Sequence, residues 1–131
     1  MKKVLTFMVA DMFHIGHLNL LIRAKSLGDY LMVGIASSWT IQEHIKYQAP
    51  IINAEDRLRI VQSIKEVDFA FIYTDTVALN ESIVCLKPDI ICRGDDNKNF
   101  VGKKMTDLLG IEIVYFPYTP GISSSKLREE I

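Results

Sequence analysis

Two histidines stand close together near the start of the chain, in the stretch "HIGH" at residues 14–17. An apolar run precedes them and a segment with helical apolar spacing follows, so we expect them in the first turn of a helix. Backbone N–H groups are unpaired at that place and the helix dipole is positive, which favours an anion. Gly16 lets a ligand approach the main chain closely. Since imidazole N–H groups can donate to phosphate oxygens, His14 and His17 predict a phosphate site at this turn.

A zinc site is the rival interpretation of two neighbouring histidines. The spacing is not that of HExxH, and Cys85 and Cys92 lie far off on other predicted elements, so zinc is the weaker reading. We assign no metal ligand from the sequence. We expect both cysteines to be small buried thiols without a disulfide.

A second turn that could bind phosphate lies near the end of the chain, in the stretch "GISSSK" at residues 121–126. Gly121 permits an unusual backbone angle, the three serines offer hydroxyls and amides, and Lys126 adds a positive charge. An ordinary serine helix cap explains this stretch equally well when it is taken alone. Together with the histidine turn it favours a cradle for a triphosphate. No segment matches the P-loop pattern GxxxxGK[ST].

Strand-like and helix-like patterns alternate along the chain. Short apolar runs at residues 3–10, 30–36, 67–73, 89–94 and 111–117 predict buried strands. Helical patterns occupy residues 17–28, 54–67, 80–87, 102–110 and 123–131, and Asn53 is expected to cap the second of them. This alternation predicts one α/β domain over residues 1–131, with a Rossmann-like five-stranded parallel sheet and helices on both faces.

Segments rich in charged and polar residues follow four of the predicted strands. They are residues 11–17, the long segment 37–52 with Lys46, the "RGDD" stretch at 93–96, and residues 118–126. Ligands bind outside the carboxyl ends of the strands in open parallel sheets. We therefore expect these segments to converge on one rim of the sheet.

Composition sets limits on the class of protein. The 131 residues carry a formal net charge of −1, which gives no electrostatic case for nucleic-acid or membrane binding. A hydrophobic content of 49% is enough for a packed core. The basic and then apolar start, "MKKVLTFMVADMF", is too short for a signal peptide and has no cleavage site, and no segment is long enough to span a membrane. We expect a cytoplasmic protein.

Four blocks of the sequence resemble a known family. They are "DMFHIGHLNLLIRAKSLGDYLMVGI", "HIKYQAPIINAEDRLRIVQSIKEVD", "KPDIICRGDD" and "PGISSSKLREEI", and together they cover nearly the whole chain. In this order they are similar to the small cytidylyltransferases of the HxGH nucleotidylyltransferase superfamily, which act on glycerol 3-phosphate, phosphocholine or phosphoethanolamine. A tRNA synthetase of the same superfamily is excluded by length.

The resemblance implies an enzyme that transfers CMP from CTP to a phosphorylated alcohol, giving a CDP-alcohol and pyrophosphate. The nucleophile is a phosphate oxygen that is already ionised at neutral pH, so no general base is required, and catalysis is positioning plus charge stabilisation. The resemblance also implies Mg²⁺ with the triphosphate and a homodimer.

Site residues follow from the same resemblance. It implies catalytic roles for His14, His17, Lys46 and Lys126, and contact with the acceptor phosphate by Lys46 and Arg57. The residues that it implies for binding the nucleotide follow the predicted strands: Val9, Ala10, Asp11, Gly16, Arg93, Gly94, Asp95, Asp96, Gly121, Ile122, Ser123, Ser124 and Ser125.

Two departures from the family pattern keep alternatives open. Residues 8–10 read Met-Val-Ala where family members have Gly-Thr-Phe or Gly-Cys-Tyr, and residues 118–120 read Tyr-Thr-Pro in place of Arg-Thr-Glu. An ATP-using adenylyltransferase of the same superfamily, similar to FAD synthase, is one alternative. A non-catalytic nucleotide-binding module is the other. The "RGDD" and "PGISSSK" blocks favour CTP.

Overall fold

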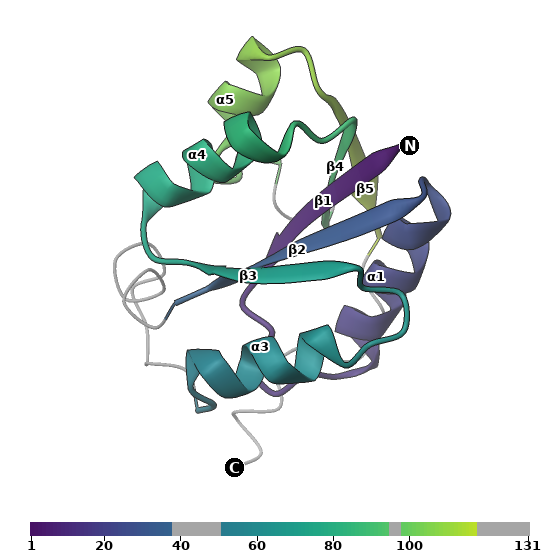
Figure 1. Ribbon diagram of the computed structural model, residues 1–131, viewed down its shortest axis with the longest axis vertical. Helices are drawn as coiled ribbons and strands as arrows, with labels where there is room; N and C mark the ends of the chain where they lie inside the picture. The colour runs from purple at the N-terminus through teal and green to yellow at the C-terminus, as the bar shows by residue number, and fades with distance from the viewer. Residues whose placement is uncertain (38–50, 95–97, 118–131) are drawn as a thin grey trace.

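The computed structural model describes residues 1–37, 51–94 and 98–117 (Figure 1). Lys46, Asp95, Asp96 and the predicted C-terminal helix at 123–131 therefore lie outside the described residues. The elements in chain order are β1 (Lys3–Met8), α1 (Ile15–Ser26), β2 (Tyr30–Ala36), α3 (Ala54–Gln62), β3 (Phe69–Tyr73), α4 (Thr76–Leu86), β4 (Ile90–Gly94), α5 (Lys103–Leu108) and β5 (Glu112–Phe116).

The five strands form one parallel sheet in the order β3-β2-β1-β4-β5, which confirms the predicted sheet. β1 is central, with Met8 beside Ile35 of β2 and Thr6 beside Cys92 of β4. The strand order reverses at β1, because β2 and β3 lie on one side of it and β4 and β5 on the other. Open α/β sheets bind ligands at such a reversal, beyond the carboxyl ends of the strands. The histidine turn directly follows β1 and therefore lies at this position.

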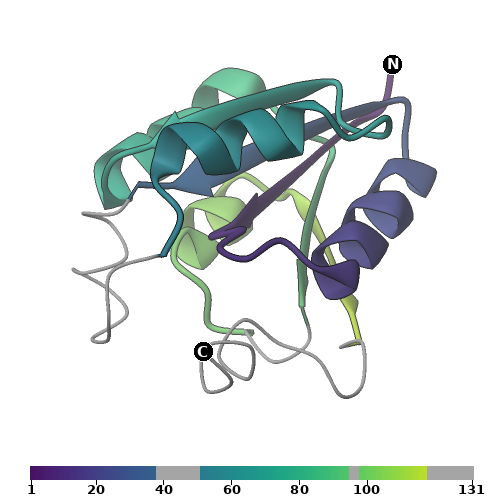
Figure 2. The same ribbon diagram turned by 90° about the horizontal axis from the view of Figure 1, so that it is seen from below.

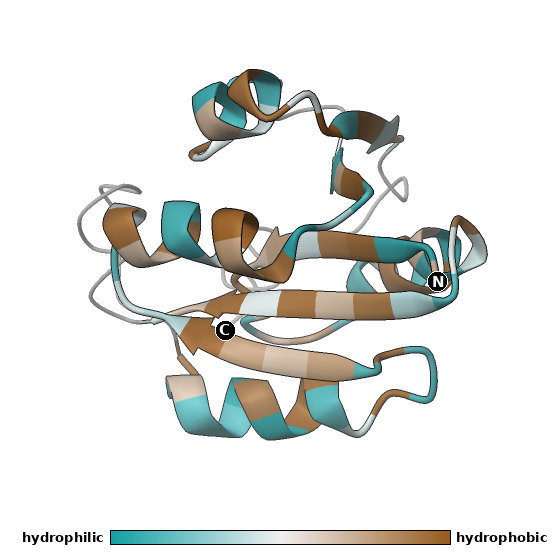
Figure 3. Cartoon of the chain, turned by 45° about the horizontal axis from the view of Figure 1, so that its top comes forward, coloured by the Kyte–Doolittle hydropathy of each residue, from teal (hydrophilic) through white to brown (hydrophobic). Residues whose placement is uncertain are grey.

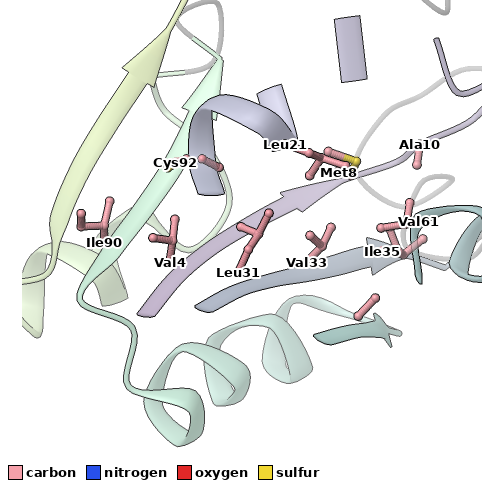
Figure 4. Close-up of a cluster of buried hydrophobic side chains, with 12 residues drawn as sticks. Val4, Met8, Ala10, Leu21, Leu31, Val33, Ile35, Val61, Ile90 and Cys92 are labelled. Carbon is pink, nitrogen blue, oxygen red and sulfur yellow. The ribbon is translucent and has the colours of Figure 1, made fainter. Parts of the chain in front are cut away.

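Helices cover both faces of the sheet, as predicted (Figures 1 and 2). α1 and α3 pack on one face, where Leu21, Ala24 and Val61 join the inward residues of the strands in a buried cluster (Figure 4). α4 and α5 pack on the other face through a second cluster that includes Leu79 and Ile83. The central strand β1 and its neighbour β2 are buried along almost their whole length, whereas the edge strands β3 and β5 are partly exposed. Most of the strand residues are coloured as apolar in Figure 3. Among the described residues, no helix has the length and apolar character needed to cross a membrane.

Side-chain caps set where two of the helices begin. Asn53 caps α3 as predicted, because its side-chain oxygen accepts a hydrogen bond from the N–H of Asp56 at 2.9 Å. Asp75 caps α4 in the same way through the N–H of Ala78 at 2.7 Å. This cap starts α4 at Thr76, so the predicted start at residue 80 was wrong.

The first strand is shorter than predicted. It ends at Met8 and not at residue 10, because the following link turns sharply, with Ala10 at φ 60° and Met12 at φ 49°. Both residues occupy the left-handed region, which residues other than glycine adopt at a cost. The turn redirects the chain from the sheet to the start of α1.

The two cysteines differ in their surroundings, and neither forms a disulfide. Cys92 is buried in β4 as predicted, and burial, with a smaller contribution from Glu112, raises the pKa of its thiol to about 12. Cys85 is exposed, so the prediction that it is buried was wrong. α4 buries Leu79 and Ile83 against the sheet, and a residue two positions beyond Ile83 lies on the opposite side of the helix.

Candidate active site

The histidines cap the helix that they precede. His14 is the N-cap of α1, and its Nδ1 accepts a hydrogen bond from the N–H of Gly16 at 2.9 Å. The Nδ1 of His17 accepts in return from the N–H of His14 at 3.0 Å. This reciprocal pair is a capping box in which histidines replace the usual Ser or Thr and Glu. The two rings lie with their centroids 4.1 Å apart.

These hydrogen bonds fix the protonation of both rings. A nitrogen that accepts from an N–H carries no proton of its own, so each imidazole holds its proton on Nε2. Burial, together with the neighbouring His14 and against an opposing effect of Asp11, lowers the pKa of His17 to about 4. Burial lowers the pKa of His14 as well. At neutral pH the pair is therefore uncharged and has two Nε2–H donors that the caps do not use.

The surroundings of the pair favour an anion. The first turn of α1 contains no acidic residue, so no side chain in that turn neutralises the positive end of the helix. Phe13 stacks on the ring of His17, with centroids 5.1 Å apart and planes 20° apart, and it also packs against the core. Phe13 was not predicted as a site residue; the available signal was an apolar residue directly before the start of the helix, where such residues pack against the first turns.

Asp11 lies beside the histidine turn and is 1% exposed. Its carboxylate accepts hydrogen bonds from the N–H groups of Ile51 and Ile52 at 3.0 and 2.9 Å. The side chain thus joins the link after β1 to the segment before α3. Its predicted contact with the nucleotide stays a prediction.

Arg57 is a fully buried residue of α3, and its guanidinium reaches the carboxyl ends of β1 and β2. Its Nη1 donates to the carbonyls of Val9 at 2.6 Å and Ala36 at 2.7 Å, and its Nε donates to the carbonyl of Ile52 at 2.9 Å. The resemblance predicted that Arg57 contacts the acceptor phosphate. That contact stays a prediction: the guanidinium has no exposed surface and binds three main-chain carbonyls, which is the geometry of a positioning side chain.

The end of β4 lies next to the end of β1. Arg93 donates from Nη1 to the carbonyl of Phe7 at 2.8 Å, and its guanidinium lies 5.1 Å from the centre of the Phe100 ring. Gly94 is the last residue of β4 and pairs with Phe116 of β5. The predicted residues that follow β1 and those that end β4 therefore share one rim of the sheet.

The other predicted site residues lie outside the described residues. They are Lys46, Asp95, Asp96, Gly121, Ile122, Ser123, Ser124, Ser125 and Lys126. Within residues 1–37, 51–94 and 98–117, no group of three or more His, Cys, Asp or Glu side chains could hold a metal ion. That part of the chain therefore offers donors to an anion and no ligand set of its own for a metal.

Comparison with known proteins gives consistent matches. Residues 8–130 match the family model described as cytidylyltransferase-like. The chain is 37% identical to glycerol-3-phosphate cytidylyltransferase of Bacillus subtilis (strain 168), over 100% of its own length and 98% of that protein. It is 32% identical to the bifunctional protein HldE of Desulfatibacillum aliphaticivorans, over 99% of its own length but only 27% of HldE. It also resembles the crystal structure of the lipopolysaccharide core biosynthesis protein from Thermoplasma volcanium GSS1, with a TM-score of 0.75, 29% identity, and coverage of 91% and 97% of the two chains.

The capping role of His17 predicts a specific dependence of stability on pH. The folded protein holds this imidazole neutral down to about pH 4, whereas an unfolded histidine binds a proton near pH 6.5. The contribution of neutral His17 to the free energy of unfolding is therefore fully present above pH 6.5. It falls progressively as the pH decreases towards 4, by up to about 3 kcal/mol in total. Urea unfolding at pH 7.5, 5.5 and 4.5 measures this loss.

His17→Asn is the matched control for that series. The asparagine oxygen can accept the N–H of His14 as Nδ1 does, but it does not titrate. The variant should match the wild type at pH 7.5 and lose less stability on acidification. Equal pH dependence in both proteins would contradict the assigned protonation of His17.

Proposed function

The chain belongs to the cytidylyltransferase-like family of nucleotidyltransferases, and we propose that it transfers CMP from CTP to a phosphorylated alcohol. The observation that carries this proposal is the neutral histidine pair at the start of α1, beyond the end of the central strand. The end-to-end match with a glycerol-3-phosphate cytidylyltransferase favours a polyol phosphate as the acceptor.

The proposed reaction is one displacement at phosphorus. A phosphate oxygen of the acceptor forms a bond to the α-phosphorus of CTP, the bond from that phosphorus to the bridging oxygen of the β-phosphate breaks, and pyrophosphate leaves. The attacking phosphate is already ionised, so the site needs no base. His14 and His17 donate from Nε2–H to the oxygens on which negative charge grows, and their fixed orientation avoids reorganisation during the reaction.

Several further elements of this proposal rest on the family resemblance. We propose that Lys46 and Lys126 bind phosphate oxygens, and that Asp95, Asp96 and the residues from Gly121 to Ser125 complete the nucleotide site. Mg²⁺ would enter with the triphosphate and neutralise part of its charge. We also propose a single catalytic domain over residues 1–131 and a cytoplasmic location.

ATP is the second candidate nucleotide. The Met-Val-Ala sequence at residues 8–10 departs from the pattern of the CTP enzymes, and in the structure Ala10 is buried with φ at 60°. An adenylyltransferase of the same superfamily would use the same histidine pair and the same displacement. A non-catalytic nucleotide-binding module is the remaining alternative.

Release of pyrophosphate distinguishes these functions. The full chain with Mg²⁺ and either CTP or ATP is incubated with glycerol 3-phosphate, other polyol phosphates, sugar phosphates, phosphocholine and phosphoethanolamine. We expect release that depends on CTP and on one phosphorylated alcohol, with formation of the CDP-alcohol. Turnover with ATP and not with CTP would establish the adenylyltransferase. Binding of nucleotide without release of pyrophosphate in the presence of any acceptor would establish the binding module.

The histidine pair should be required for turnover more than for folding. His17→Asn keeps an acceptor for the cap but removes the Nε2–H donor, so we expect kcat to fall about 100-fold or more while the fold is retained. His17→Ala should lose turnover to a similar extent and should also lose about 1 kcal/mol of stability with the cap. A near-normal kcat for His17→Asn at saturating substrates would refute the assigned role.

We propose that the protein is a homodimer, as the resemblance to small cytidylyltransferases implies. Sedimentation velocity at micromolar concentrations is expected to give a species of twice the 14.9 kDa chain mass. A single monomeric species over the whole concentration range would rule out the dimer.

A further inference from the structure

We propose that Arg57 and Asp11 are positioning residues, which aim the two imidazoles by holding the link between β1 and His14 in one conformation. The structural part of this inference stands on contacts within the described residues. Its kinetic part rests on the proposed transfer reaction.

The link cannot hold its own shape. It turns through two left-handed residues, Ala10 and Met12, at φ 60° and 49°. Each such residue costs of order 1–2 kcal/mol and persists only where the surrounding structure imposes this conformation. In addition, the main-chain N–H of His14 must face the Nδ1 of His17 at 3.0 Å for the reciprocal cap to form. A change in the link would therefore shift the cap and both rings with it.

Two buried side chains tie this link to its surroundings, Arg57 from outside the link and Asp11 from within it. Arg57 binds its first residue through the carbonyl of Val9, at 2.6 Å. The third residue of the link, Asp11, binds the N–H groups of Ile51 and Ile52. Ile52 completes the connection, because its N–H binds Asp11 and its carbonyl binds Arg57. The link is thus held at two points against the segment that leads into α3.

Burying the charged side chains of Arg57 and Asp11 costs free energy, and this cost makes their hydrogen bonds strong constraints on the conformation of the link. Arg57 is 0% exposed and Asp11 is 1% exposed, and a buried charged group is tolerated only when hydrogen bonds compensate it. Such groups hold their partners firmly, since a displaced partner leaves a charge uncompensated. The same guanidinium also binds the carbonyl of Ala36 at the end of β2, which fixes the link relative to the sheet.

Arg57→Met tests the proposal, and Arg59→Met is the matched control. Arg59 lies two residues further along α3 and is exposed, so its replacement changes charge and length without touching the link. In Arg57→Met we expect the pKa of His17, followed by NMR, to rise by one unit or more from about 4 towards 6.5 as the ring loses its fixed, buried place. We expect kcat to fall at least about tenfold, with the acceptor KM within about twofold of the wild type. Arg59→Met should change neither quantity.

The alternatives give different results. A direct contact between Arg57 and the acceptor phosphate would raise the acceptor KM about tenfold or more and leave the pKa of His17 unchanged, and this outcome overturns the proposal. An unchanged pKa of His17 with unchanged kinetics overturns it as well. If the wild type transfers no nucleotide at all, the proposed function fails, but the His17 titration still decides the positioning role.

Two further variants cover the case in which Arg57→Met does not fold. Arg57→Lys keeps the charge but lacks the planar fork that reaches three carbonyls, and Asp11→Asn replaces one acceptor oxygen by a donor that faces an N–H. Folded Arg57→Lys should show the same rise in the pKa of His17, and a wild-type pKa in this variant would overturn the proposal. Asp11→Asn also removes a carboxylate that itself raises the pKa of His17, so its readout is kinetic. We expect its kcat to fall at least about tenfold with the acceptor KM within about twofold of the wild type, and an unchanged kcat would overturn the role of Asp11.

Discussion

The reciprocal hydrogen bonds between the histidine rings and the first N–H groups of α1 are the interaction on which the site depends. They commit the Nδ1 atoms of His14 and His17 to the main chain, which leaves the proton of each ring on Nε2. Burial then keeps the pair neutral. A local capping arrangement thereby sets the helix start, the tautomers and the charge of the groups that we propose to contact the nucleotide.

The strand order of the sheet sets the position of this cap, and we propose that the buried side chains of Asp11 and Arg57 set its orientation. Reversal of the strand order at β1 leaves the histidine turn beyond the centre of the sheet, next to the end of β4. Ala10 and Met12, two of the three non-glycine residues with positive φ in the described part of the chain, lie in the link after β1, and the side chains of Asp11 and Arg57 are buried beside this link. Costly conformations and buried charges are thus concentrated beside the candidate site, where a fixed geometry serves positioning and charge stabilisation.

The sequence predicted the regular parts of this molecule well, because they follow from apolar periodicity. The five strands, the helices on both faces and the Asn53 cap were all confirmed. The reciprocal cap formed by both histidines was not predicted, since capping preferences point to Ser, Thr, Asp and Asn, and two imidazoles next to a glycine were interpreted as ligand donors. Burial of Arg57 was not predicted either, because an arginine in a helix is usually exposed and two of its three carbonyl partners, those of Val9 and Ala36, are distant in sequence. The exposure of Cys85 depends on the exact helical phase of α4, which the apolar content of that segment did not reveal.

¹⁵N NMR of the histidine side chains shows directly whether His14 and His17 are neutral Nε2–H donors. At pH 7 we expect both rings to be protonated at Nε2 and unprotonated at Nδ1. We also expect their Nε2 resonances to shift when CTP and Mg²⁺ are added, while the Nδ1 resonances stay in place. Imidazolium rings, or a proton on Nδ1 in either residue, would refute the assignment of the pair as neutral donors.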